Sequence, residues 1–145
     1  MSLQVRRARD AEELAAARAL REQVFCHEQG VPLEADLDGL DGDAVQLVAV
    51  DDDGIVLGTC RVLIEPGGTA RFGRLCVSAA VRGRGVGGAL LAEAERESRA
   101  GSARRIGMHA QTRALELYRR AGYAPYGDPF DEEGIEHVGM EKRLT

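Results

Sequence analysis

The sequence contains no hydrophobic run long enough to cross a membrane, a length of roughly 18 residues. Its first residues, MSLQVRRARD, also lack the apolar core of a secretory signal. Cysteine is scarce: the thiols of Cys26, Cys60 and Cys76 are odd in number and far apart, which argues against a disulfide framework. We therefore expect a cytoplasmic protein with no membrane partner.

Positive charge is missing from a long stretch of the chain. No Lys or Arg occurs between His27 and Cys60, a segment rich in Asp and Glu, whereas Arg61 to Arg84 is rich in arginine. The net charge of −5 argues against a nucleic-acid partner, because such proteins usually present a basic surface. The asymmetry is either an unevenly charged, solvated surface or a pair of sites for ligands of opposite charge. In the second case the acidic segment would favour a cationic acceptor.

The pattern along the 145 residues predicts one α+β domain. A strand over 3–7, a helix from the N-cap Asp10 to about Phe25 and a long loop precede three strands joined by the turns DDDG and EPGGT. A helix from Val86 to about Arg99, a strand over 103–110, a helix over 112–122 and two last strands follow. We find neither a linker nor a repeat, so residues 1–145 are predicted to form a single domain.

The segment VRGRGVGGALL, residues 81–91, has glycines at the G-x-G-x-x-G spacing of a dinucleotide-binding turn. That turn needs a parallel β-α-β unit and an acidic residue about 20 positions further on. Here the preceding connections are too short for parallel crossovers, and the segment RRIGMHA at that distance has no acid. No G-K-[ST] follows, which excludes a P-loop as well.

A glycine-rich turn that enters a helix still has the properties of a pyrophosphate site. Its backbone N–H groups are unpaired and lie at the positive end of the helix dipole. Glycine lets a phosphate approach the main chain, and Arg82 and Arg84 add charged donors at the same place. The sequence therefore predicts a pyrophosphate cradle, residues 82–88, at the start of the helix that contains Val86.

Two motifs resemble a known family. RLCVSAAVRGRGVGGALL resembles the coenzyme A-binding motif of the GNAT acetyltransferases, [RQ]-x-x-G-x-[GA] after a strand with a bulge. ALELYRRAGY, residues 114–123, is similar to the family's second motif, a helical tyrosine followed by A/G-G-[FY]. The order of elements also fits, so the resemblance covers essentially the whole chain, and VFCHEQGVP, MHAQ and GIEHVGM resemble the ElaA-like branch. It implies a mixed, mostly antiparallel sheet flanked by helices and an acetyl-CoA-dependent N-acetyltransferase.

The resemblance implies roles for residues of both motifs. The strand before the cradle would pair through its backbone with the pantetheine arm, and one of its N–H groups would stabilise the oxyanion of the tetrahedral intermediate. Tyr118 would protonate the departing thiolate, because a phenol with a reference pKa of about 10 keeps its proton at neutral pH. The predicted coenzyme-binding residues are Leu75, Cys76, Val77, Arg82, Gly83, Arg84, Gly85, Val86, Gly87 and Gly88.

The acceptor is expected to be a primary amine of a small molecule or peptide that attacks acetyl-CoA directly in a ternary complex. Glu28, His109 and Gln111 are candidates for contacting it. The acid-rich loop lacks the register of a calcium loop, and we expect no metal. The resemblance suggests a homodimer, and a module that binds an acyl-CoA without turnover is the alternative function. The general base is left open among Glu28, Glu34, Asp36, His109 and His137.

Overall fold

The computed structural model describes residues 2–144 and contains a seven-stranded sheet in the order β1-β2-β3-β4-β5-β7-β6. All neighbouring strands are antiparallel except β4 and β5, which confirms the predicted mostly antiparallel α+β fold. The strands are β1 (Gln4–Arg7), β2 (Val45–Val50), β3 (Val56–Glu65), β4 (Thr69–Val77), β5 (Arg105–Gln111), β6 (Ala124–Glu132) and β7 (Ile135–Arg143).

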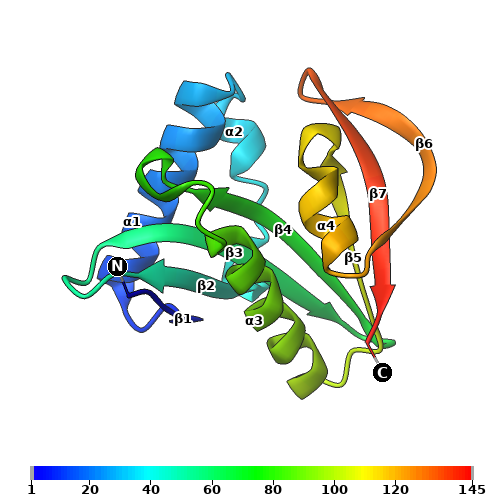
Figure 1. Ribbon diagram of the computed structural model, residues 1–145, viewed down its shortest axis with the longest axis horizontal. Helices are drawn as coiled ribbons and strands as arrows, with labels where there is room; N and C mark the ends of the chain where they lie inside the picture. Colours follow the sequence, from blue (N-terminus) through cyan, green and yellow to red (C-terminus); the bar gives the residue numbers. More distant parts are fainter. Residues whose placement is uncertain (1, 145) are drawn as a thin grey trace.

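Helices cover both faces of the sheet, with α1 and α2 on one side and α3 and α4 on the other (Figure 1). Within residues 2–144, no helix has the length and apolar character that a membrane crossing requires. The α-helices are α1 (Ala11–Arg21), α2 (Leu33–Asp36), α3 (Val86–Ala100) and α4 (Leu115–Arg120). The shorter helical segments are η1 (Glu22–Glu28), η2 (Asp41–Asp43), η3 (Ala79–Val81) and η4 (Thr112–Ala114).

The first helix begins as predicted and ends later. The side chain of Asp10 accepts a hydrogen bond from the Glu13 amide at 2.9 Å, so Asp10 is the N-cap of α1. The helix then continues without a break into the π-helical segment η1 and stops before Gly30, whose φ of 77° is left-handed. The predicted end near Phe25 is therefore too early, and Glu28 is carried by a helix rather than by a loop.

The core lies on both faces of the central strands. Leu47 and Cys60 point toward α3, where they join a large cluster with Leu90, whereas Val48 and Val50 pack on Ala17 of α1. Because both faces are covered, residues 47–50 of β2 form a continuous buried apolar run rather than an alternating one.

Strands β4 and β5 part after a short parallel contact. Only Thr69, Ala70 and Arg71 of β4 pair with β5, and the rest of β4 pairs with β3 alone. A bulge at Arg74, whose φ is 56°, shifts the β3–β4 register between Thr59 and Arg61, and bulged strands bend. Each strand therefore has a free edge on the side of the other, and the two diverge along their length (Figure 1).

Candidate active site

The glycine turn forms an open backbone cradle at the start of α3. Gly83 and Gly85 have φ values of 79° and 81°, and a Cβ atom added at either one would meet nothing within 4 Å. The amide of Ala89 makes the first hydrogen bond of the helix ladder, to the Gly85 carbonyl at 3.1 Å. The amides of Val86 and of the two glycines after it precede that ladder, so they are available to an anion. These residues fit a pyrophosphate group.

The two arginines of the cradle differ: Arg82 is hydrogen-bonded to other residues, whereas Arg84 is exposed. Arg82 donates through Nε to the Val77 carbonyl at 3.0 Å and through Nη2 to Oε1 of Glu28 at 2.6 Å. Arg84 extends into solvent. The structure therefore places Glu28 beside the cradle, on η1, and not among the side chains that line the cleft described below.

The remaining predicted coenzyme-binding residues join β4 to α3 and α4. Cys76 is buried, and burial raises the pKa of its thiol to about 12, so it is a protonated core residue and no nucleophile. Val86 is buried in the core as well. A Cβ at Gly87 would lie 3.8 Å from Leu75 and 3.5 Å from Leu117 of α4, so Gly87 allows close packing at the point where β4, α3 and α4 meet.

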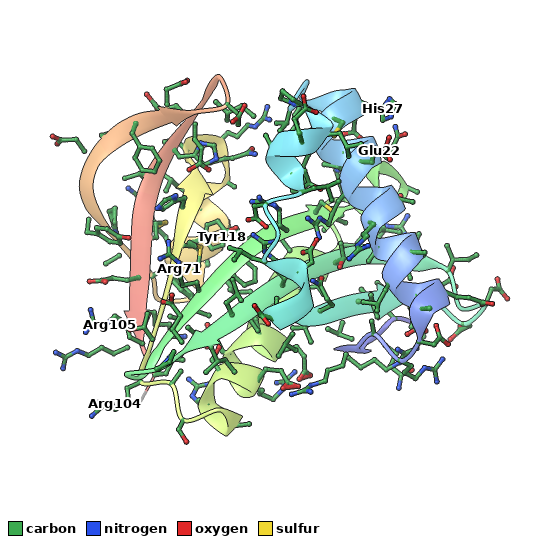
Figure 2. The ribbon with its side chains drawn as sticks, turned by 180° about the vertical axis from the view of Figure 1, so that it is seen from behind. Glu22, His27, Arg71, Arg104, Arg105 and Tyr118 are labelled. Atoms are coloured by element: carbon green, nitrogen blue, oxygen red, sulfur yellow. The ribbon has the colours of Figure 1, made fainter. Side chains whose placement is uncertain are left out.

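Tyr118 lies at the gap between β4 and β5. It projects from α4, which ends in a Schellman motif: the Gly122 amide donates to Arg119 and the Tyr123 amide to the Tyr118 carbonyl, both at 3.0 Å. The Tyr118 ring packs edge-on against Phe72 of β4, with ring centroids 6.3 Å apart. Seen from the α1 face, Tyr118 lies where the two strands separate (Figure 2).

The Tyr118 hydroxyl has no hydrogen-bond partner among residues 2–144, although the side chain is buried. Burial raises the pKa of the phenol above its ordinary value, and the neighbouring Cys60 adds to the shift. Tyr118 therefore keeps its proton across the working range of pH and is available as a hydrogen-bond donor. The Tyr123 hydroxyl, by contrast, donates a hydrogen bond to the carboxylate of Glu95 of α3 at 2.9 Å.

A cleft of about 790 Å³ opens on the α1 face of the sheet, along the divergence of β4 and β5. Tyr118 lines it, as do the predicted residues Leu75, His109 and Gln111. Gln111 donates to Gln29, the residue after η1, at 2.9 Å, and so connects β5 to the helical side of the cleft. The structure thus brings Tyr118, His109 and Gln111 together and leaves Glu28 on the cradle side.

The acidic segment reaches the sheet through a buried ion network of three carboxylates and three guanidinium groups: Asp36, Asp38, Asp41, Arg21, Arg61 and Arg74. Arg21 is 1% exposed and contacts Asp36 at 3.1 Å and Asp41 at 2.8 Å. Arg74 at the bulge contacts both Asp36 and Asp38 at 3.1 Å. Three carboxylates of the acidic segment are therefore paired with arginines, two of which come from the basic segment, so these three are not free to face a cationic acceptor.

We expect this network to make stability fall in acid. The Arg61 guanidinium, hydrogen-bonded to Asp38, holds the pKa of that carboxyl well below its ordinary value, although burial opposes the shift. A depressed pKa contributes stability that is complete above the unfolded value, about 3.9, and is lost as pH falls below it. In urea unfolding, Asp38→Asn should be less stable than the unmodified protein at pH 7, and the difference should shrink below about pH 4. A difference that does not change with pH would contradict this account.

Sequence reasoning missed the network, although one signal was present. Arg21 falls on the same helical face as the buried Ala17 and Val24, and a charge at such a position needs a buried partner. Its partners, Asp36 of α2 and Asp41 of η2, lie 15 and 20 positions away, and nothing in the local pattern names them.

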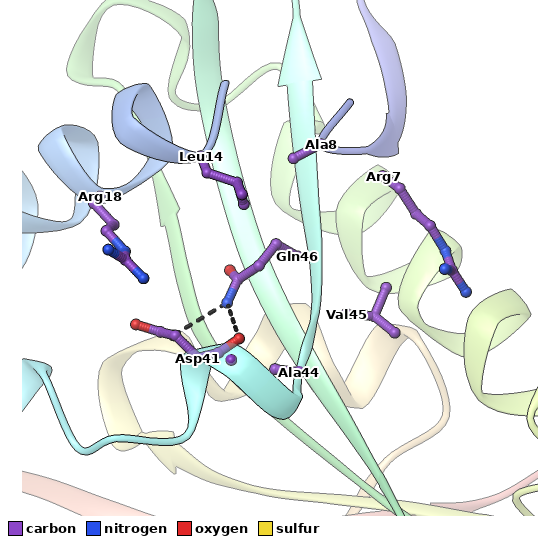
Figure 3. A pocket seen from close by; sticks show the side chains of 9 residues that line it. Arg7, Ala8, Leu14, Arg18, Asp41, Ala44, Val45 and Gln46 are labelled. Carbon is purple, nitrogen blue, oxygen red and sulfur yellow. Dashed lines mark hydrogen bonds between the residues drawn. The ribbon is translucent and has the colours of Figure 1, made fainter. Parts of the chain in front are cut away.

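A smaller pocket of about 340 Å³ lies between the start of α1 and β2 (Figure 3). Leu14, Arg18 and Gln46 line it, and Gln46 donates to the Asp41 side chain at 3.1 Å. It contains none of the residues predicted for the site.

Comparison with known proteins agrees with this geometry. The sequence profile described as "Acetyltransferase (GNAT) domain" matches residues 9–144. YjcF of Bacillus subtilis, called an uncharacterized N-acetyltransferase, is 33% identical over 136 residues, which are 93% of this chain and 96% of YjcF. Protein ElaA of Escherichia coli is 31% identical over 140 residues, 91% of this chain and 88% of ElaA. The ElaA crystal structure superposes with a TM-score of 0.83 at 26% identity, covering 97% of this chain and 98% of that one.

A more distant structure shares the fold. YncA of Salmonella typhimurium, solved with its cofactor acetyl-CoA, superposes with a TM-score of 0.78 at 17% identity, covering 100% of this chain and 95% of that one.

The sheet, the cradle and the sequence profile define an acyltransferase: the chain belongs to the GNAT acetyltransferase family. Within that family it falls in the ElaA-like branch, as the resemblance of its motifs had indicated.

Proposed function

We propose that the protein transfers the acetyl group of acetyl-CoA to a primary amine of a small molecule or peptide by direct attack in a ternary complex. The observation that carries the proposal is that one strand, β4, positions two features. An open anion cradle follows β4 at the start of α3, and a buried tyrosine with a free hydroxyl packs on Phe72 at the gap beside the same strand. A cradle alone would support binding, and the free phenol along the same strand supports chemistry.

The cradle would hold the pyrophosphate on the amides that precede the α3 ladder, with Arg84 adding charge. The free edge of β4 would pair with the pantetheine arm as an added strand does, which orients the thioester toward Tyr118. A backbone N–H of β4 would stabilise the oxyanion that forms when the amine attacks. The Tyr118 hydroxyl would then donate its proton to the departing thiolate. Gln111, on the wall of the cleft, would contact the acceptor.

The test is release of free thiol from acetyl-CoA, measured with a thiol reagent across putrescine, tyramine, glucosamine and trialanine. Acceptor-dependent release, with the acetylated amine identified by mass spectrometry, is the expected result. Binding of acetyl-CoA in calorimetry with no release for any acceptor would favour the alternative function, an acyl-CoA-binding module.

Two further parts of the proposal concern context. We infer a cytoplasmic location, because the structure contains three free cysteines, of which Cys60 and Cys76 are buried as thiols. We also infer a homodimer, in line with the family resemblance, and size-exclusion chromatography with light scattering tests this assembly directly.

A further inference from the structure

Of the five candidate bases named from the sequence, one lines the cleft with a basic atom that no other group engages. Of the candidate bases, Glu28 is bound to Arg82 at 2.6 Å, and Asp36 is 5% exposed between two arginines. Glu34 does not line the cleft. His137 lines it but is 7% exposed, and its Nε2 faces Glu132 at 3.7 Å. His109 is the remaining candidate.

The ring of His109 is oriented by a carboxylate. Its Nδ1 lies 3.0 Å from Oε1 of Glu132. A carboxylate only accepts hydrogen bonds, so Nδ1 carries the hydrogen and the neutral ring keeps its lone pair on Nε2. Phe130 packs edge-on against the ring, with centroids 5.0 Å apart, which limits its rotation. The side chain is nevertheless 44% exposed, so the ring can exchange a proton with water.

The β6–β7 hairpin places Glu132 at this position. Glu133 and Gly134 both have positive φ, 54° and 76°, as in the two-residue turns that match the twist of paired strands. The turn sets Glu132 opposite Ile135 and Phe130 opposite His137. His137 donates through Nδ1 to the Ile135 carbonyl at 2.7 Å and stacks on Phe130, so its own ring is held by contacts within the hairpin.

We propose that His109 is the general base of the transfer and that Glu132 is its positioning residue, an inference that rests on the proposed function. Nε2 of His109 takes a proton from the ammonium group of the acceptor as the nitrogen attacks the acetyl carbon. The C–N bond forms, the carbonyl π electrons move to oxygen, and the collapse of the intermediate breaks the C–S bond. The thiolate takes the Tyr118 proton, the second proton of the attacking nitrogen returns the Tyr118 phenolate to the phenol by way of solvent, and the proton on His109 leaves to solvent. The net products are the acetylated amine, coenzyme A and one proton.

Charged or titratable groups reach the cleft around the proposed base from several elements, among them Glu133 of the β6–β7 turn and Tyr118 of α4. Glu132 faces it from β6 and His137 lies beside that carboxylate on β7. Arg71 lines the same cleft from β4, at the last β4–β5 pair (Figure 2). Imidazole suits the role, because it is the side chain whose ordinary protonation range includes neutral pH.

The test compares His109→Asn with His137→Asn in single turnover, using the amine from the thiol-release panel that reacts fastest. Asparagine keeps a donor near the Nδ1 position but has no basic nitrogen. At pH 7 we expect His109→Asn to lower the rate of acetyl transfer by about 10²-fold with unchanged acetyl-CoA affinity, and His137→Asn to change it only a few-fold. The deficit of His109→Asn should narrow toward pH 10, because a growing fraction of an alkyl amine, with a reference pKa of about 10, arrives already deprotonated. An unchanged rate, or a deficit constant with pH, would overturn the proposal.

The role of Glu132 is tested separately. Glu132→Ala should lower the rate about as much as His109→Asn, whereas Glu132→Gln should restore most of it, because its amide oxygen still accepts from Nδ1. Equal rates in both Glu132 variants would remove it as a positioning residue. If the unmodified protein releases no thiol with any acceptor, the proposed function itself fails; if it does and the His109 variant keeps its rate, only this inference fails.

Discussion

Replacing Gly85 with glutamate is expected to abolish acetyl-CoA binding while the protein remains folded. Gly85 is the N-cap of α3 and has a left-handed backbone, and the space in front of it is open. A glutamate there would occupy that space and set a carboxylate against the phosphates at a helix N-terminus. Isothermal calorimetry with acetyl-CoA should show at least a hundredfold loss of affinity, about 3 kcal/mol.

The matched control for this variant is Gly67→Glu. Gly67 lies in the β3–β4 turn, at the far end of β4 from the cradle, and it too has a positive φ and no atom within 4 Å of the Cβ position. Both changes therefore impose the same kind of backbone strain and the same charge, but only one should affect the coenzyme. Unchanged affinity in a folded Gly85→Glu protein would remove the cradle as the phosphate site.

The second large effect is expected for Tyr118→Phe, which keeps the ring against Phe72 and deletes the hydroxyl. If the phenol protonates the thiolate, the single-turnover rate of acetyl transfer should fall by about 10²-fold or more. Acetyl-CoA affinity should change little, because the cradle is untouched. Stability should also change little, because the hydroxyl has no protein partner among the described residues to lose. Quenched-flow measurement of the acetylated amine separates chemistry from product release.

Tyr123→Phe is the control, because Tyr123 is equally buried and its ring contacts that of Tyr118, with centroids 6.1 Å apart. Its hydroxyl donates to the buried Glu95, so the change should lower the free energy of unfolding by about 1–3 kcal/mol and leave the transfer rate nearly intact. The two variants thus have opposite expected profiles. Equal rates in Tyr118→Phe and the unmodified protein would exclude Tyr118 as the acid.

Much of the fold could be predicted because its signals are local. The turns DDDG and EPGGT set the meander, the Asp10 cap starts α1, and Gly122 ends α4 with a φ of 95°. The π-helical continuation of α1 was not predictable in this way, because Arg21, the last residue of α1, interrupts the apolar face and finds its carboxylate partners only in three dimensions. The helix predicted over 112–122 is also shorter, since Thr112–Ala114 form a separate 3₁₀ turn and α4 begins at Leu115.

The candidate site, like the fold, has some features with a local sequence signal and others that form only in three dimensions. Residue type permits the left-handed conformations that Gly83 and Gly85 adopt but does not specify them, because Gly87 and Gly88 are helical. The pairing of Arg82 with Glu28 spans 54 positions and that of His109 with Glu132 spans 23, so neither could be read from neighbouring residues. The number of carboxylates in the acidic segment did not reveal the ion network either, because it does not say which carboxylates are paired with arginines.

The brief β4–β5 contact also has a consequence for how the chain folds. Three parallel residue pairs connect the β1–β4 part of the sheet to the β5–β7 part, and the chain between them must first run through α3. Pairing β4 with β5 closes a long loop, and the chain loses that conformational entropy before the contacts between the two strands stabilise it. This seam should therefore form late in folding, after the β2–β3–β4 meander. Within the sheet the same seam should open first by sub-global unfolding, although the two parts also share one hydrophobic core. A ligand that bridges the two free edges would then act as a missing strand between the two parts.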